Sequence, residues 1–592
     1  MNRIVVTFLL ATIISLSCKR AGEVDIDLQY DNNISLEYDQ VIAAYESLAR
    51  HYPEARLVEV GQTDIGKPLH LFMISKGRDF DPASIRKKGK CIIMVNNGIH
   101  AGEPEGIDAS IQFAWDILSN KNDLYKYLDR VVLAIIPVYN IGGALDRSQY
   151  YRTNQNGPVY KGRRRNARNM DLNRDFAKQE TRNARSFAGT FTNLNPDIFV
   201  DTHVTNGSDH QYTVTLIPTL YSKLDPAMGK FFKERMLPGL YDRMEKNSDY
   251  GMIPYVQTRS RSNIRGGIIA YNDNRYYSTG YTSMFNCYSF MTENLVYKPF
   301  PDRVRSVVDF LTQLVDFTSE NAKEIRELKD AADIAVREQK VFELSWKLDD
   351  TYSEELLFKG YEYSTVESPG SNRRSGFYDH DRPWTDTIPY FTKFDADLTV
   401  SKPYAYIIPQ AWEEIADKLR NNKVGIYRLE EDIIVEVETY YIDKSEASPR
   451  TTQGHHVNTG VEVHSVIQPM QYYKGDFVVH VNQLSNKYIV EMLEPHAPDS
   501  YFVWNFFDPI LESHDFYSIW GFESHLMELL EQDDNLKQEL EKKKAGDPGF
   551  ASDPLAQLQY LYQKTPYSEI EKWNRLYPVA RLNEKTALPL GE

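Results

Sequence analysis

Cysteine is scarce in this sequence, whose 592 residues contain only Cys18, Cys91 and Cys287. The last two lie in apolar stretches, CIIMVNN and MFNCYSFM, where a free cysteine usually behaves as a small buried hydrophobic residue. A cysteine nucleophile is therefore not expected. A disulfide between Cys91 and Cys287 stays an open alternative, because such bonds form in oxidising compartments and the sequence does not decide it.

Basic residues are outnumbered by acidic ones, 68 to 84, and the formal net charge is −16. Binding to a nucleic-acid backbone requires clustered cations that displace its counterions, so we expect no nucleic-acid partner. One dense basic run, residues 161–168, stands out against this acidic background. Its charge needs a local explanation.

Long hydrophobic runs are absent after the N-terminus, and no later segment is apolar enough to cross a bilayer. The first residues read MNRIVVTFLLATIISLSC, in which Arg3 precedes an apolar run that ends near Cys18. This pattern resembles a bacterial lipoprotein signal. It predicts a secreted chain that is anchored in the periplasm or outer membrane through a lipidated Cys18. A plain secretory signal is the alternative.

The chain is too long for a single hydrophobic core, and its texture changes along its length. Apolar runs that read as strands (LHLFMIS, CIIMVNN, VVLAIIPVY, DIFVDTHV, SFMTENLVY) alternate with helical patterns such as IDASIQFAWDIL. This alternation predicts an α/β domain with a mixed, mostly parallel sheet between helices. Short β-like pieces and then a charged helical tail follow. We predict these divisions: signal 1–18, tether 19–35, catalytic domain 36–325, helical linker 326–345, and β-rich accessory domain with a helical C-terminal region 346–592.

The first candidate site lies in the Gly-rich segment NNGIHAGEPEG, directly after a predicted strand, where His100 and Glu103 are three residues apart. Catalytic zinc takes three protein ligands from His and carboxylate and keeps a fourth position for water. His203 follows about a hundred residues later at the end of the strand DIFVDTHV. Because α/β sheets place ligands at the carboxyl ends of their strands, these three residues are a candidate metal site. A hydrogen-bonded core histidine is the alternative for His203.

Between these ligand candidates lies RRRNARNMDLNRDF, which contains Asp171, Asn173 and Arg174 within four residues. Arginine binds carboxylates through two parallel hydrogen bonds, so an Arg–Asn pair beside a metal suits an anionic chain terminus. The alternative is that the basic run is a solvated loop. Its position beside a metal site on an acidic chain favours anion recognition.

The order of these motifs resembles the zinc carboxypeptidase A family over residues of about 36–320. The matching pieces are HxxE, R-x-N-x-x-x-x-D-L-N-R, a His at a strand end, and the Glu in SFMTENLVY. The resemblance implies a metallocarboxypeptidase that cleaves peptides with a free C-terminal carboxylate. It assigns one zinc ion to His100, Glu103 and His203, carboxylate binding to Asn173 and Arg174, the oxyanion to Arg164, and the orientation of a zinc-bound histidine to Asp171.

By the same resemblance, Glu293 is the general base and then the general acid. Independently, a Glu in an apolar strand is costly unless it is paired or functional. Two positions depart from the family: Gly102 stands where animal members often carry Arg, and Val204 where Ser is common. The substrate-capping tyrosine is either Tyr271 or Tyr281, or neither.

Other histidines in the second half of the chain could form a second metal site. The alternative is that they are solvated and bind no metal. His455, His456 and His464 lie close together, and His380 stands between two aspartates. Adjacent histidines on a strand point to opposite faces, so we expect these side chains to be solvated.

Two other functions stay open for the chain as a whole. One is hydrolysis of a peptidoglycan stem peptide or an N-acyl compound at the same zinc site. The other is a non-catalytic lipoprotein that binds peptides or glycans. The oligomeric state and the preferred terminal residue are not readable from the sequence.

Overall fold

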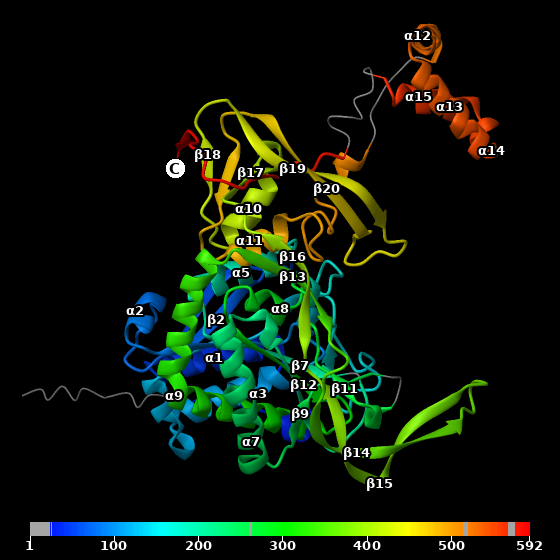
Figure 1. The fold of residues 1–592 in the computed structure, drawn as a ribbon. Coiled ribbons are helices and arrows are strands. Elements are labelled where there is room, and N and C mark those ends of the chain that lie inside the picture. Colours follow the sequence, from blue (N-terminus) through cyan, green and yellow to red (C-terminus); the bar gives the residue numbers. More distant parts are fainter. Residues whose placement is uncertain are drawn as a thin grey trace, which may run out of the picture.

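The computed structural model describes residues 24, 26–205, 207–259, 263–512, 519–565 and 575–591 (Figure 1). The predicted signal peptide and Cys18 lie outside these residues. No helix among the described residues has the length and apolar character needed to cross a membrane.

An eight-stranded mixed sheet organises the first half of the chain. Neighbouring strands β4, β3, β7 and β12 are parallel, whereas β1–β2, β2–β4 and β12–β8 pair antiparallel. Strands β3 and β4 are buried along their whole length, as continuous apolar runs predict. The sheet order is β1 (Ala55–Gln62), β2 (Pro68–Ile74), β4 (Val131–Ile136), β3 (Cys91–Asn96), β7 (Ile198–Thr205), β12 (Tyr288–Leu295), β8 (Val214–Pro218), β9 (Met252–Pro254).

Helices cover both faces of this sheet, and a separate hydrophobic core fills each side. One core contains residues of the long helix α9 together with its neighbours, and the other contains residues of three shorter helices. The first set is α1 (Tyr38–His51), α3 (Glu105–Leu118), α6 (Pro226–Phe231), α7 (Leu237–Asn247) and α9 (Phe300–Glu338); the second is α2 (Pro82–Lys87), α5 (Arg182–Leu194) and α8 (Ser278–Ser283).

A seven-stranded sheet, antiparallel throughout, dominates the second half. Strand β22 comes late in the sequence, yet it lies between β19 and β17 in the middle of the sheet. The order is β20 (Asn458–Tyr472), β19 (Ile433–Ala447), β22 (Ala580–Leu582), β17 (Ala405–Ile408), β21 (Phe477–His480), β18 (Tyr427–Leu429), β23 (Leu590–Gly591), with helices α10 (Glu413–Asn421) and α11 (Asn486–Leu493).

Smaller elements complete the structure. Two long strands form an extended hairpin that leads away from the eight-stranded sheet (Figure 1). Four C-terminal helices have a hydrophobic cluster of their own. These elements are the sheet β10 (Gln257–Thr258), β11 (Ile268–Ile269), β15 (Arg374–Phe391), β14 (Glu354–Glu367); the pair β13 (Val341–Leu348), β16 (Phe394–Ser401); the pair β5 (Arg147–Ser148), β6 (Lys161–Gly162); and α4 (Ile141–Leu145), α12 (Ile519–Gln532), α13 (Asp534–Gly546), α14 (Pro548–Ala551), α15 (Pro554–Tyr562).

The two large sheets share one hydrophobic core. Leu69 and Phe199 of the first sheet belong to the same buried cluster as Ile408, Val479 and Ile489 of the second region. The predicted fold class is confirmed: an α/β layer with a mixed sheet, then β-rich sheets and C-terminal helices. Helix α9 runs through the predicted boundary at residue 325, and the division into domains stays a prediction.

Candidate active site

Three adjacent parallel strands bring the predicted site residues to one edge of the eight-stranded sheet. His203 on β7 and Glu293 on β12 are register partners, so their side chains project from the same face. His100 and Glu103 lie in the turn between β3 and α3. Because β3 pairs in parallel with β7, this turn opens at the same end as His203.

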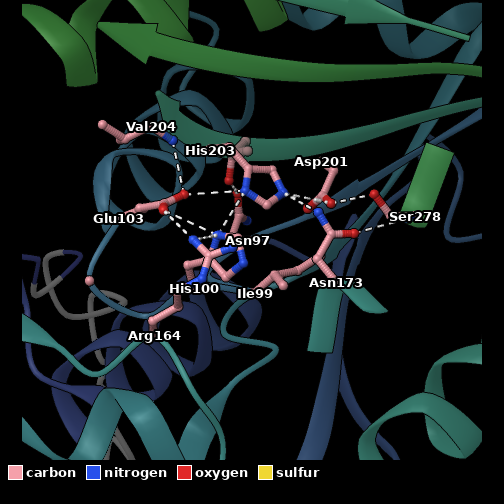
Figure 2. Close-up of polar contacts among 12 residues, drawn as sticks. Asn97, Ile99, His100, Glu103, Arg164, Asn173, Asp201, His203, Val204 and Ser278 are labelled. Atoms are coloured by element: carbon pink, nitrogen blue, oxygen red, sulfur yellow. Dashed lines mark hydrogen bonds and ion pairs between the residues drawn. The ribbon is translucent and has the colours of Figure 1, made fainter. Parts of the chain in front are cut away.

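The ligand atoms of His100, Glu103 and His203 converge to within 4.8 Å of one another, and all three side chains are buried (Figure 2). The two histidine Nδ1 atoms are 3.2 Å apart. Glu103 places Oε1 3.1 Å from Nδ1 of His100 and Oε2 3.2 Å from Nδ1 of His203. Among the described residues, this is the one group of three or more His, Cys, Asp or Glu side chains arranged to hold a metal ion.

A second carboxylate lies on the far side of each imidazole ring, away from Glu103. His100 Nε2 is 3.1 Å from Asp171, and His203 Nε2 is 2.9 Å from Asp201. Each Nε2 can donate its N–H to its aspartate, which leaves the lone pair of each Nδ1, on the side of Glu103, available to a metal ion. Arg164 Nη1, which can only donate, lies 3.3 Å from His100 Nδ1 and supports this assignment. Two imidazole lone pairs and a carboxylate form a donor set that suits zinc.

Arg152, which the sequence did not reveal as a site residue, stabilises the negative charge of Glu103. Arg152 Nη1 donates to Glu103 Oε1 at 2.6 Å. Burial alone raises the pKa of Glu103, but Arg152 and His100 together hold it well below its usual range. A β-carbon at Gly102 would stand 2.7 Å from Cδ of Arg152 and 2.6 Å from the carbonyl oxygen of Gly162. Glycine at position 102 therefore leaves the space that Arg152 occupies.

Glu293 lies in the same pocket, which has a volume of about 310 Å³. Burial raises the pKa of its carboxyl to about 7; His203 opposes this rise and Glu103 adds to it. A carboxyl group with a pKa near neutrality can both take and return a proton.

The anion-binding candidates also line this pocket. Arg164 donates through Nε to Asp171 Oδ2 at 3.0 Å. Burial would raise the pKa of Asp171, yet His100 and Arg164 hold it far below its usual range. The guanidinium of Arg174 lies over the ring of Tyr277, 4.3 Å from its centroid. Eight predicted residues line the pocket: His100, Glu103, His203, Glu293, Arg164, Asn173, Arg174 and Tyr271.

The two candidate capping tyrosines have different positions. Tyr271 lines the pocket, and its hydroxyl donates to the hydroxyl of Tyr277 at 2.7 Å. Tyr281 is fully buried, packs against Phe191 and Phe285, and donates to Asn422 Oδ1 at 2.6 Å. The structure therefore does not bring Tyr281 to the substrate pocket, because α8 turns its ring into the hydrophobic core.

Sequence reasoning missed Asp201 and Tyr277 as well as Arg152. Asp201 precedes His203 by two residues on a strand, so period-two alternation placed both on one face and offered a usable signal. Its Oδ2 also accepts from Ser278 Oγ at 2.5 Å. Tyr277 stood in the Tyr-rich segment YNDNRYYSTGY, where nothing separated it from its neighbours.

The rival histidines have carboxylate or backbone partners instead of a shared metal site. His455 Nε2 lies 2.9 Å from the Glu180 carboxylate, and His464 Nδ1 lies 2.6 Å from Asp443. His380 Nε2 lies 2.6 Å from Asp209, and His456 Nδ1 lies 2.7 Å from the carbonyl oxygen of Ser448.

Residues 41–275 match the family model described as zinc carboxypeptidase. This segment of the chain is therefore similar to a zinc carboxypeptidase domain. Members of this family are peptide hydrolases, so the predicted family and enzyme class are confirmed.

Curated relatives and solved structures are similar to the chain at low identity. The chain is 21% identical to carboxypeptidase 2 of Trichophyton tonsurans over 462 residues, 73% of this chain and 78% of the relative. It is 25% identical to the probable carboxypeptidase 2 of Arthroderma benhamiae over 114 residues, which span only 19% of that relative. A putative carboxypeptidase A from Shewanella denitrificans has 17% identity and a TM-score of 0.36, covering 48% of this chain and 69% of its own.

Proposed function

We propose that this protein is a zinc-dependent metallocarboxypeptidase that hydrolyses the C-terminal peptide bond of its substrates. One observation carries the proposal. A single pocket holds the ligand set His100, Glu103 and His203, the half-buried carboxyl of Glu293, and the guanidinium of Arg174.

Zinc bound by the three ligands would lower the pKa of a water molecule and polarise the peptide carbonyl. Glu293 takes a proton from the attacking water and later passes it to the departing amine, as a carboxyl with a pKa of about 7 allows. Arg164 carries a fixed positive charge at the rim of the ligand set and stabilises the oxyanion of the tetrahedral intermediate.

Arg174 and Asn173 restrict cleavage to the end of a peptide by binding its free carboxylate. Arg174 already has its guanidinium plane set by Tyr277 and by a hydrogen bond from Nη1 to the Asn173 carbonyl at 2.7 Å. A guanidinium held in this way loses little entropy when it binds a carboxylate through two hydrogen bonds. This arrangement supports a substrate with a free α-carboxylate over an internal amide.

The test compares a peptide with a free C-terminus and its amidated twin by liquid chromatography. We expect cleavage of the free peptide alone, stoichiometric zinc by elemental analysis, and loss of turnover on dialysis against a chelator. Equal cleavage of both peptides would instead favour an amidohydrolase without carboxylate recognition. Metal-free protein without chelator-sensitive activity would favour the alternative of a non-catalytic lipoprotein that binds peptides or glycans.

We also propose that the chain is exported and lipid-anchored through Cys18 in the bacterial envelope. The support is the basic, apolar and small-residue order of its first 18 residues. Membrane fractionation of the wild type and of Cys18→Ala tests this. Recovery of both proteins in the membrane fraction would contradict lipidation at Cys18.

A further inference from the structure

The segment that carries the anion-binding residues rests on the C-terminal region. The backbone N–H of Asp171 donates to Gln453 Oε1 at 2.7 Å. Further along the same segment, the Ala177 carbonyl accepts from the Tyr488 hydroxyl at 2.9 Å. The carboxylate of Glu180 pairs with His455, a neighbour of Gln453 in the chain. Both ends of the segment 171–180 are thus bound to residues 453–455, which lie 282 and 275 positions away from their partners in the sequence.

The tyrosine-rich segment on the other side of the pocket is attached to the same region. The backbone N–H of Arg275 donates to Asp499 Oδ2 at 2.6 Å. The ring of Tyr276 meets the ring of Trp504 edge-on, with centroids 6.0 Å apart. Trp504 is only 3% exposed, so its ring is fixed by packing.

Both attached segments contact or contain Arg174. Its guanidinium carbon lies 5.5 Å from the ring centroid of Tyr276, in addition to its contact with Tyr277. Tyr276 therefore touches Arg174 and Trp504 at once. Gln453 holds the turn that begins at Asp171 and ends at Arg174. The orientation of the guanidinium depends on both contacts, because stacking and the backbone together set its plane.

The backbone at Gln453 gives independent support. Gln453 and Gly454 both have positive φ, at 53° and 89°, in a two-residue turn closed by Thr452 and His455. Asn-Gly is the favoured pair in such turns, and a glutamine at φ > 0 is an unfavourable choice for the backbone alone. The hydrogen bond from Asp171 to the Gln453 side chain offers a reason for this choice of residue.

We propose that Gln453 and Trp504 are positioning residues for the substrate-carboxylate site. Neither touches the substrate. Gln453 holds the Asp171–Arg174 turn, and Trp504 holds Tyr276 against Arg174, so the C-terminal region sets the affinity for a free C-terminus. This inference rests on the proposed function, because it assigns these residues to the carboxylate anchor of that reaction.

The experiment uses the full chain with Gln453→Met and Trp504→Leu, which remove the acceptor and the aromatic edge. Gln468→Met and Phe507→Leu are matched controls. Gln468 bonds only within the β19–β20 pair in its described contacts, and Phe507 packs against Trp412 and Tyr577. Trp504→Phe keeps an aromatic ring at the contact and serves as the conservative variant.

For the two test variants, we expect KM for the free peptide to rise about tenfold, with kcat and zinc content little changed. The controls and Trp504→Phe keep the wild-type KM even where they lower the melting temperature. Calorimetric binding of an N-acetyl dipeptide with a free carboxylate reads the same site without turnover, and its Kd should rise by a similar factor.

Wild-type KM and Kd in both test variants would overturn the inference, as would equal losses in the controls. Failure of the proposed function looks different. The wild type would then cleave free and amidated peptides equally or not at all, whereas the dipeptide Kd still reports whether Gln453 and Trp504 position Arg174.

Discussion

The two large sheets contain similar amounts of β-structure, but only the eight-stranded sheet gathers chemistry at one edge. Its strands β3, β7 and β12 are adjacent and parallel, so the groups at their carboxyl ends meet. Every pair in the seven-stranded sheet is antiparallel, and neighbouring strands end at opposite edges. Strand direction therefore decides whether distant sequence segments can build a site.

Buried charge also has different roles in the two regions. Glu494 is fully buried beside the seven-stranded sheet, where it accepts from the Tyr406 hydroxyl at 2.5 Å and lies 3.5 Å from Arg581. Glu293 faces a pocket with the ligand set. A buried carboxyl alone does not mark an active site; its access to a pocket does.

The largest expected effect tests this contrast directly. Glu293→Gln should lower kcat by about 10³-fold or more while zinc stays bound, because the amide cannot accept the water proton. Steady-state kinetics and elemental analysis measure both quantities. Glu494→Gln is the matched change in the other region, and we expect a lower melting temperature with wild-type kcat. Similar kcat losses in the two variants would break the comparison.

Metal removal should affect the two regions unequally. A ligand that binds only the folded state stabilises it, so dialysis against a chelator should lower the melting temperature by about 5 °C. Hydrogen exchange should become faster in residues 97–104 and in β7, where the ligands lie, and stay unchanged in β17 and β21. Equal loss of protection in both sheets would contradict a metal site confined to the first region.

A smaller effect concerns Asp108, a buried acid of the first region that lies outside the pocket. Burial raises the pKa of Asp108 from its ordinary 3.8 to about 8, so the folded chain keeps a proton that the unfolded chain loses. This group's contribution to stability is therefore lost as pH rises from about 4 to about 8.

Asp108→Asn removes this dependence. Relative to the wild type, the variant should gain about 4 kcal/mol in unfolding free energy between pH 5 and pH 8, as urea titrations would measure. A constant difference between the two proteins across this range would show that Asp108 does not titrate on unfolding.

Much of the first region was predictable because its strands are long apolar runs. The five runs read as strands are β2, β3, β4, β7 and β12, and IDASIQFAWDIL is most of α3. The metal ligands followed from their positions at strand ends. Arg152 was not predictable, because it lies in an irregular segment and its contact with Glu103 depends on the tertiary fold.

The role of the second region was hidden for the same reason. Gln453 and Trp504 carry no local signal, since their partners lie more than 200 residues away in the chain. Tyr281 could not be distinguished from Tyr271 because helix α8 was not foreseen, and only the helix turns that ring into the core.

The central position of β22 has a consequence for the order in which the two large sheets fold. Residues 580–582 leave the ribosome well after β17 and β19, yet they pair with both strands in the middle of the sheet. The seven-stranded sheet cannot close between β17 and β19 until residues 580–582 have been made, and its core is shared with the eight-stranded sheet. In a nascent chain, the eight-stranded sheet is therefore made long before the second sheet that shares its core is complete.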